Sequence, residues 1–556
     1  PRPPVVLPTL DAPLVLGDPA APRPPVRPAV AAPVRRPVVR EPIDRTKAVY
    51  IIRLFGNVLP GLLFAWFWHR FLARRTRSAA LREAVFFSTM AGSSLYAYSE
   101  VFASHAHNAF CLAASMMALA EQRQRDVLDR MEGREPGFQF VLSLLAGMFG
   151  AGCALFEYPA AIVSGVMALW ILASAAERRR ALLLVSGLAL GVGALALTKH
   201  DHKKGAAVCA ALAVAAYGAT LSHRSVTRLI AAGLGAVPPM ALAMLYHKRA
   251  FGDALKTGYS FLENAQFRSE ISQGFFGATS FSWEAGLRLW FDPAFGLIPC
   301  TFVFAVSAFG VGALLAWEPE GTLLPTASPL NVSRRAAVRG FFAALVLVSL
   351  VKLVKAMQAH GTNLAHGDVG AWMLAMSMAS IGLFSVTLPP PTRRDRSLGA
   401  AILLSCLGMT FLIGMMNNWR GGWQVGPRYL VTLIPPLAIA ALAALDSLYA
   451  RLDDVPFARR ALTVFAAGST ACAFFVTGLP SAWFPHIPVE FVSPFYEMVM
   501  PLLRGGFAPR NAGAFLFHQQ GMSSMWGFAL AAVAMAAIVL RGEERRPLAA
   551  VAHACA

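Results

Sequence analysis

The segment RYLVTLIPPLAIAALAALDS, residues 428–447, decides the fold class of this chain. It is 20 residues long, and no charged side chain lies between its first arginine and the aspartate near its end. A helix of about 20 apolar residues is long enough to cross the hydrocarbon core of a bilayer. The segment therefore predicts a transmembrane helix.

Similar segments recur along the chain. Its residues are 56% hydrophobic and 14% charged, with a mean hydropathy of +0.54, whereas soluble domains carry about 25% charged residues. This composition excludes a soluble enzyme and a disordered chain. The candidate spans are 50–69, 84–98, 102–120, 138–155, 158–175, 181–198, 205–221, 228–246, 297–317, 338–357, 371–388, 398–416, 428–447, 461–479 and 524–540. We expect an all-α polytopic integral membrane protein with about 13–15 transmembrane helices, of which the short 84–98 segment suits a re-entrant helix.

The segments outside these spans define the predicted domain organisation. Residues 1–47 contain 13 prolines and 8 basic residues, which favours an extended, polyproline-like tail. Residues 48–541 form the predicted transmembrane domain, with two longer outer-face loops at 247–296 and 480–523, and residues 542–556 form a cytoplasmic tail. The seven cysteines show no metal-ligand spacing, so we interpret them as packed apolar residues.

Membrane orientation accounts for most of the net charge of +19. If the loop 70–83 is cytoplasmic, the loops on its side carry 26 of the 49 basic residues and the opposite loops carry 12, as the positive-inside rule requires. Nucleic acid is therefore not an expected partner. The assignment leaves an odd number of spans, so we expect one more helix before residue 1; a true odd-span protein is the alternative.

Two short turns on the outer side hold candidate acid/base groups. The turn YSEVFASHAHNAF, residues 98–110, contains Glu100, His105 and His107, and FEYPAAIV, residues 156–163, contains Glu157. Ionisable groups beside spans are costly and often functional. Glu100, His105 and Glu157 suit proton transfer, and His105 with His107 suits a divalent cation such as Mg or Mn. The alternatives are histidines that only hydrogen-bond and a carboxylate favoured by a helix dipole.

The long loop 247–296 interleaves aromatic residues with glycine, proline and a few charges. It includes FGDALKTGYSFLENAQF, residues 251–267, and leads into LWFDPAFGLIPC, residues 289–300. Aromatic rings stack on sugars, and a lysine contacts phosphate, so Lys256, Tyr259 and Glu263 are candidate substrate-binding residues. An ordinary interfacial belt of aromatic residues is the alternative.

The strongest single signal is NNWRGGWQVGPRYLVTLIPPLA, residues 417–438. Glycines allow a phosphate to approach backbone N–H groups, and arginine grips phosphate with two parallel hydrogen bonds. The positive-inside rule does not require arginines on the outer side of the membrane. The candidate substrate-binding residues here are Arg420, Gly421, Gly422, Arg428 and Tyr429.

The string WRGGWQVGPRYL, followed by an apolar span with prolines, resembles polytopic membrane glycosyltransferases of the GT-C class. The resemblance is closest to bacterial members related to dolichyl- or polyprenyl-phosphate-mannose-dependent mannosyltransferases. The segments SHAHNAF, FEYPAA, KTGYSFLENAQF and FDPAFGL follow the expected order, and the resemblance covers about residues 48–447. It implies an enzyme of the cell envelope, with its active face on the periplasmic side of a bacterial inner membrane.

The resemblance also implies a polyprenyl-phosphate sugar donor and a glycan, lipid or protein acceptor, brought together in the plane of membrane lipid. Such enzymes carry a catalytic Asp or Glu in the first outer loop, which here would precede residue 50. The carboxylates in that region are Asp11, Asp18, Glu41 and Asp44. The base is then one of these or lies upstream of Pro1, or the protein is a non-catalytic relative.

Other functions compete with this interpretation. A lipid-linked polysaccharide ligase or polymerase also uses arginine and histidine on the outer face. A transporter would place polar residues at mid-membrane in two repeated halves, and no such repeat is visible. A non-catalytic membrane subunit is a further alternative.

Overall fold

The computed structural model describes residues 45–76, 78–100, 104–174, 203–220, 222–261, 268–270, 273, 277–292, 295–315, 329–360, 372–373, 376, 379–380, 383, 395–421, 426–483, 491, 495–508 and 511–544. The chain divides into two compact units, Pro1–Tyr50 and Ile51–Ala556. Only residues 45–50 of the first unit are described, and they are helical. The tail predicted for residues 1–47 therefore lies almost wholly outside the described residues.

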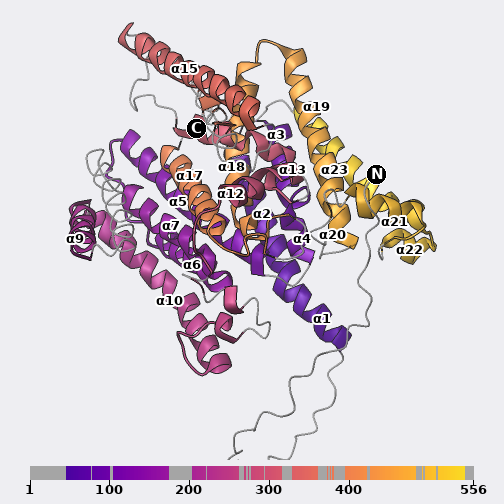
Figure 1. The fold of residues 1–556 in the computed structure, drawn as a ribbon, viewed down its shortest axis with the longest axis horizontal. Helices are drawn as coiled ribbons and strands as arrows, with labels where there is room; N and C mark the ends of the chain where they lie inside the picture. Colours follow the sequence, from indigo (N-terminus) through magenta and orange to yellow (C-terminus); the bar gives the residue numbers. More distant parts are fainter. Residues whose placement is uncertain are drawn as a thin grey trace, which may run out of the picture. The chain divides into compact units, whose positions relative to one another are not determined.

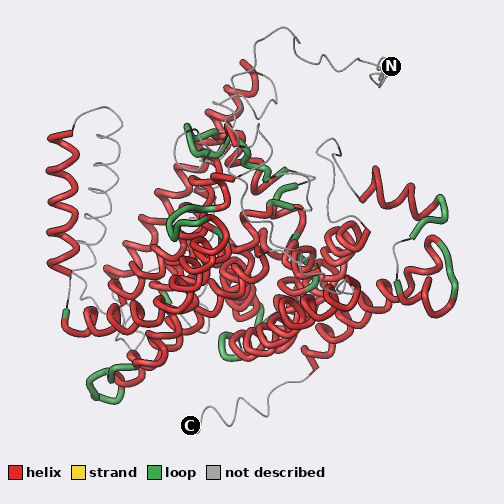
Figure 2. The backbone as a smooth tube through the Cα atoms, turned by 90° about the horizontal axis from the view of Figure 1, so that it is seen from below, coloured by secondary structure: helices red, strands yellow, loops and turns green. Residues whose placement is uncertain are grey.

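The described residues form helices and no strand (Figure 2). The longer helices are α2 (Leu59–Ala73), α3 (Ala79–Met90), α5 (Ser104–Met131), α6 (Phe140–Phe156), α7 (Ala161–Ser174), α9 (Lys203–Thr220), α10 (His223–Phe251), α15 (Pro329–His360), α17 (Arg396–Gly414), α18 (Ile434–Arg451), α19 (Pro456–Ala473) and α23 (Trp526–Glu544). The shorter ones are α1 (Arg45–Arg53), α4 (Ser94–Glu100), α12 (Trp283–Phe291), α13 (Leu297–Cys300), α14 (Ser307–Leu315), α20 (Leu479–Trp483), α21 (Met500–Arg504) and α22 (Ala512–Phe517). Short 3-10 and π-helical segments are η1 (Leu54–Val58), η2 (Tyr158–Ala160), η3 (Gly258–Phe261), η4 (Phe302–Val306), η5 (Arg428–Leu433), η6 (Phe474–Gly478), η7 (Phe495–Val499) and η8 (Gly521–Met525).

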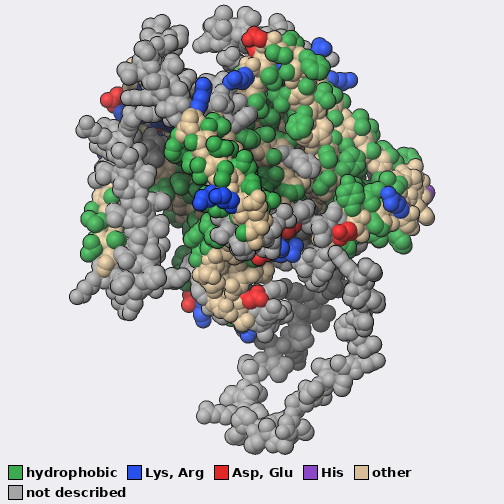
Figure 3. Space-filling view, turned by 45° about the horizontal axis from the view of Figure 1, so that its top comes forward, with side chains coloured by type: hydrophobic (Ala, Val, Ile, Leu, Met, Phe, Trp, Pro, Cys, Tyr) green, Lys and Arg blue, Asp and Glu red, His purple; other side chains and the backbone are tan. Residues whose placement is uncertain are grey.

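Length and composition identify this as an all-α polytopic membrane protein, as predicted. Within the described residues, 7 helices are long and apolar enough to cross a membrane, and 4 shorter helices are also apolar. Hydrophobic side chains cover most of the described surface on the face in Figure 3, as expected where lipid replaces water. The predicted span 181–198 and most of 371–388 lie outside the described residues, so the number of 13–15 spans stays a prediction.

Several helices extend beyond the expected spans: α15 begins at Pro329, and α10 runs from His223 to Phe251. Two further segments also differ. The predicted span 102–120 is the first part of α5, which continues to Met131 through much of the expected loop 121–137. Its extra turns are held because Arg228 of α10 donates two hydrogen bonds to the carboxylate of Asp126, at 2.7 and 2.8 Å, and both side chains are buried. The segment 84–98 is divided between α3 and α4, which are separated by residues 91–93.

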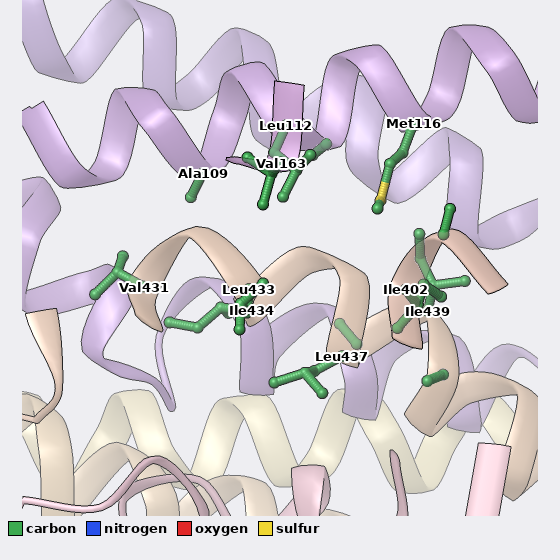
Figure 4. Packing of buried hydrophobic residues seen from close by; sticks show 14 of the residues in the cluster. Ala109, Leu112, Met116, Val163, Ile402, Val431, Leu433, Ile434, Leu437 and Ile439 are labelled. Carbon is green, nitrogen blue, oxygen red and sulfur yellow. The ribbon is translucent and has the colours of Figure 1, made fainter. Parts of the chain in front are cut away.

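Helix α18 lies at the centre of the second unit (Figure 1), and the apolar segment that it forms together with η5 is entirely buried. Figure 4 shows Leu433, Ile434 and Leu437 in one buried cluster with Ala109 and Leu112 of α5. The small residues of α18 allow unusually close helix contacts. A Cβ on Gly310 of α14 would lie 1.6 Å from the carbonyl oxygen of Ala440, so only glycine fits this crossing.

The long loop expected at 247–296 contains short helices among its described residues, and its residues 277–282 lie against the segment that follows α17. Thr279 N–H donates to Met415 O and Ser282 N–H donates to Gly414 O, both at 2.9 Å. Asn417 N–H in turn donates to Gly277 O at 3.2 Å. These bonds fix the loop beside residues 417–421, which begin the glycine-rich string.

Candidate functional site

The turn between α6 and α7 presents a carboxylate to the beginning of α5. Glu157 has an extended backbone, and the helical turn η2 starts directly after it at Tyr158, with Pro159 in its first turn. His105 Nδ1 lies 2.8 Å from Glu157 Oε1, and Ser104 Oγ donates to the same oxygen at 2.6 Å. The side chains of His105 and Glu157 are only 10% and 12% exposed. Two of the predicted acid/base residues are therefore in direct contact.

The surroundings of Glu157 favour its charged form. Burial alone would raise the pKa of this carboxyl, but the hydrogen bond from His105 and its favourable electrostatic interaction, the hydrogen bond from Ser104 and the charge of Arg428 outweigh it. The net result is a pKa below the ordinary value of 4.5. Glu157 is therefore a stable anion that orients His105 through Nδ1–H.

Tyr429 joins this pair to the glycine-rich string. The ring of His105 packs edge-to-face on two tyrosines. Its centroid lies 4.9 Å from that of Tyr98 and 6.5 Å from that of Tyr429. Arg428 lies over the ring of Tyr429, 4.8 Å from its centroid, and donates from Nη2 to the Tyr429 hydroxyl at 3.0 Å. A cation thus lies on the same tyrosine as the imidazole.

Gly421 covers one edge of the Arg428 guanidinium. Its φ of +71° is in the left-handed region, which strains any residue with a Cβ. A Cβ at this position would lie 2.7 Å from Arg428 Nε and 2.8 Å from Tyr429 Cε2. Glycine is required here both for backbone conformation and for space beside Arg428.

The guanidinium of Arg420 lies against two other aromatic rings, next to the group formed by Arg428 and Tyr429. Its guanidinium carbon lies 5.2 Å from the ring centroid of Phe295 and 5.8 Å from that of Trp419. The Nε atoms of Arg420 and Arg428 are buried and have no hydrogen-bond partner among the described residues. A buried N–H without an acceptor costs about 1–3 kcal/mol, so both arginines have unused capacity to bind an anion.

His107 does not share the surroundings of His105. Its Nε2 contacts the carbonyl oxygen of Gly56 in η1, and its ring stacks on Phe156 at a centroid distance of 5.2 Å. Because the two histidines are two residues apart on α5, they project to different sides of the helix. Among the described residues, no group of three or more His, Cys, Asp or Glu side chains could hold a metal ion. The divalent cation expected at His105 and His107 stays a prediction.

The other predicted site residues are not brought to this group within the part of the chain that is described. Glu263 and Gly422 lie outside the described residues, as do the side chains of Glu100 and Tyr259. Lys256 is described and exposed, on the turn that follows α10.

The structure adds two side chains that the sequence reasoning did not select. Ser104 directly precedes His105, so its position in SHAHN was a usable signal. Tyr98 belongs to the same quoted turn but contacts His105 only because α4 and α5 are packed against each other. Comparison of the whole chain with family models, curated proteins and solved structures finds no match.

Proposed function

We propose that this chain is an integral membrane glycosyltransferase that transfers a sugar from a polyprenyl-phosphate donor to an acceptor on the outer face of a bacterial inner membrane. The observation that supports it best is the contact of His105 with Glu157, together with the packing of His105 and Arg428 on the same ring of Tyr429. An oriented imidazole next to a guanidinium combines a proton acceptor with an anion-binding group.

Each group has a defined task in this reaction. The acceptor hydroxyl attacks the anomeric carbon of the sugar, and the bond between that carbon and the phosphate oxygen breaks. His105 takes the hydroxyl proton at Nε2, because Nδ1 is held by Glu157. Arg428 stabilises the charge on the departing polyprenyl phosphate, as a preorganised cation does most effectively in a water-poor site.

Glu157 is assigned an orienting role. A carboxylate with a lowered pKa and two hydrogen-bond donors is a weak base. The pair resembles a general dyad in which an anion fixes the tautomer of a histidine and stabilises its protonated form. Replacing Glu157 by Gln should therefore reduce the turnover rate more than donor binding.

The test uses the full chain in proteoliposomes supplied with radiolabelled polyprenyl-phosphate sugars and with membrane extract as a source of acceptors. We expect sugar transfer, or slow release of free sugar to water, with wild type. His105→Ala should lower the rate about 10²–10⁴-fold, the usual contribution of a general base. Arg460→Ala, which removes an exposed arginine of α19, serves as the matched control.

Two outcomes contradict the proposal. Wild-type protein that leaves every polyprenyl-phosphate sugar intact would remove the donor assignment. Activity only with a lipid carrying a preassembled polysaccharide would favour the ligase or polymerase alternative instead.

A further inference from the structure

The end of α10 and the turn after it carry three exposed cations. Lys248 and Arg249 lie in the last helical turn, and Lys256 lies on the turn that follows; all three side chains are exposed. None of the three forms an ion pair with a carboxylate among the described residues. They belong to the minority of basic residues that the positive-inside rule does not explain.

These cations lie directly beyond an apolar surface. Leu242, Leu245 and Tyr246, on the preceding turns of α10, are 57%, 53% and 59% exposed. Leu255, next to Lys256, is 81% exposed. Because a helix rises 1.5 Å per residue, the change from exposed apolar to exposed basic side chains occurs within about one turn. This pattern is typical of the boundary between hydrocarbon and lipid headgroups.

The turn bearing Lys256 is held against the helix. Gly252 ends α10 with a φ of +78° and donates its N–H to Lys248 O at 3.1 Å. His247 Nδ1 lies 3.1 Å from Ala254 O, which makes it the donor and leaves Nε2 to accept from Tyr158 Oη at 2.8 Å. The ring of Phe251 stacks on Phe261 beyond the turn, 5.1 Å between centroids. The third cation is thus fixed near the other two.

Local interactions do not neutralise the positive charge of these three side chains. The one described carboxylate in this turn, Asp253, accepts from Leu255 N–H at 2.9 Å and closes the turn. The dipole of α10 favours Lys248 and Arg249 at its C-terminus. It does not account for Lys256, which lies outside the helix.

We propose that Lys248, Arg249 and Lys256 form a binding site for the headgroups of anionic phospholipids. The apolar face of α10 contacts the acyl chains, and the three cations contact the phosphate and its neighbouring anionic groups. This inference does not rest on the proposed glycosyltransferase activity. His247, next to Lys248, forms a hydrogen bond with Tyr158 of the FEYP turn, so bound lipid would also stabilise the turn that carries Glu157.

The experiment measures which lipids the purified full chain retains from an equimolar mixture of phosphatidylglycerol and phosphatidylcholine, by native mass spectrometry. The test variant is K248Q/R249Q/K256Q. The matched control K248R/R249K/K256R keeps the charge at all three positions. At low salt, each neutralised cation should lower the ratio of retained phosphatidylglycerol to phosphatidylcholine by up to about fivefold, and the control should match wild type.

Other results would overturn the assignment. If the neutral variant has the melting temperature of wild type in phosphatidylcholine and retains the same ratio of phosphatidylglycerol to phosphatidylcholine, the three cations do not bind lipid headgroups. Displacement of phosphatidylglycerol by equimolar polyprenyl phosphate would assign the site to the donor lipid. Displacement by millimolar inorganic phosphate would show an unspecific anion site.

Discussion

At the scale of single residues, the candidate site depends on how buried charges compensate one another. Glu157 and His105 are largely buried, and an isolated buried charge in this position would be costly. The carboxylate is stabilised by donors from two α5 residues, and Arg428 contributes a favourable charge from another element. The interaction of these groups ties the FEYP turn to α5.

This compensation predicts a pH dependence of stability. Because the pKa of Glu157 is lowered on folding, its interactions stabilise the protein above its ordinary value of 4.5, and this contribution is lost as the pH falls through the folded-state pKa. We expect wild type to melt at a higher temperature than Glu157→Gln at pH 6, with the difference shrinking at lower pH. Thermal unfolding in detergent between pH 3 and 7 measures it, and a difference that grows on acidification would contradict the assignment.

Gly421 provides a second test at this scale. Gly421→Ala places a methyl group against Arg428 Nε and strains the backbone by about 1–2 kcal/mol. We expect the variant to bind polyprenyl phosphate more weakly than wild type. Gly133→Ala is the matched control, since φ there is also +71° and a Cβ meets nothing within 4 Å; equal binding losses in both variants would show that Gly421 has no specific role in the site.

At the scale of elements, helix packing positions the site. The buried helix α18 follows η5 without a break, so the position of Arg428 and Tyr429 is set by how α18 packs against its neighbours. The contact with α14 is tight enough to exclude any side chain at Gly310. The site thus depends on contacts made deep in the helix bundle.

The α14–α18 crossing can be tested by overpacking. Gly310→Ala should destabilise the protein by about 1–3 kcal/mol, because the new methyl group collides with a backbone carbonyl that cannot move independently. Gly340→Ala on α15, where a Cβ meets nothing within 4 Å, should be stabilising by about 0.5–1 kcal/mol. The measurement is the melting temperature of each variant; Gly310→Ala at or above wild type would refute the close crossing.

At the scale of the whole molecule, the sequence predicts the fold class more readily than it predicts which side chains are in contact. Apolar run lengths predict membrane helices, because bilayer thickness fixes how many residues a span needs. They do not predict where α5 ends, since its extension to Met131 depends on the Asp126–Arg228 pair formed across 102 positions. The sequence places His105 and Glu157 at the same membrane interface but does not predict that they are in contact. The separation of His107 from this pair follows from helix geometry. The Ser104 and Tyr98 contacts require the packed fold.

Orientation in the membrane is a prediction at this scale. In a cysteine-free background, Asp253→Cys should react with a membrane-impermeant maleimide on intact cells. Glu132→Cys, between α5 and α6, should react only after permeabilisation, since both positions are exposed and belong to loops on opposite sides under the positive-inside rule. The reverse labelling pattern would invert the topology and move the candidate site to the cytoplasmic face.

The proposed function requires that a lipid phosphate binds at Arg428, and a direct binding measurement tests this. Polyprenyl phosphate is titrated into wild type, Arg428→Ala and Arg428→Lys in the same detergent. We expect Arg428→Ala to weaken binding by about 1.5–3 kcal/mol, the range for a hydrogen bond to a charged group. Arg428→Lys should recover only part of this loss, because lysine lacks the planar two-point grip of arginine. If Arg428→Ala binds polyprenyl phosphate with wild-type affinity, the phosphate does not bind at Arg428.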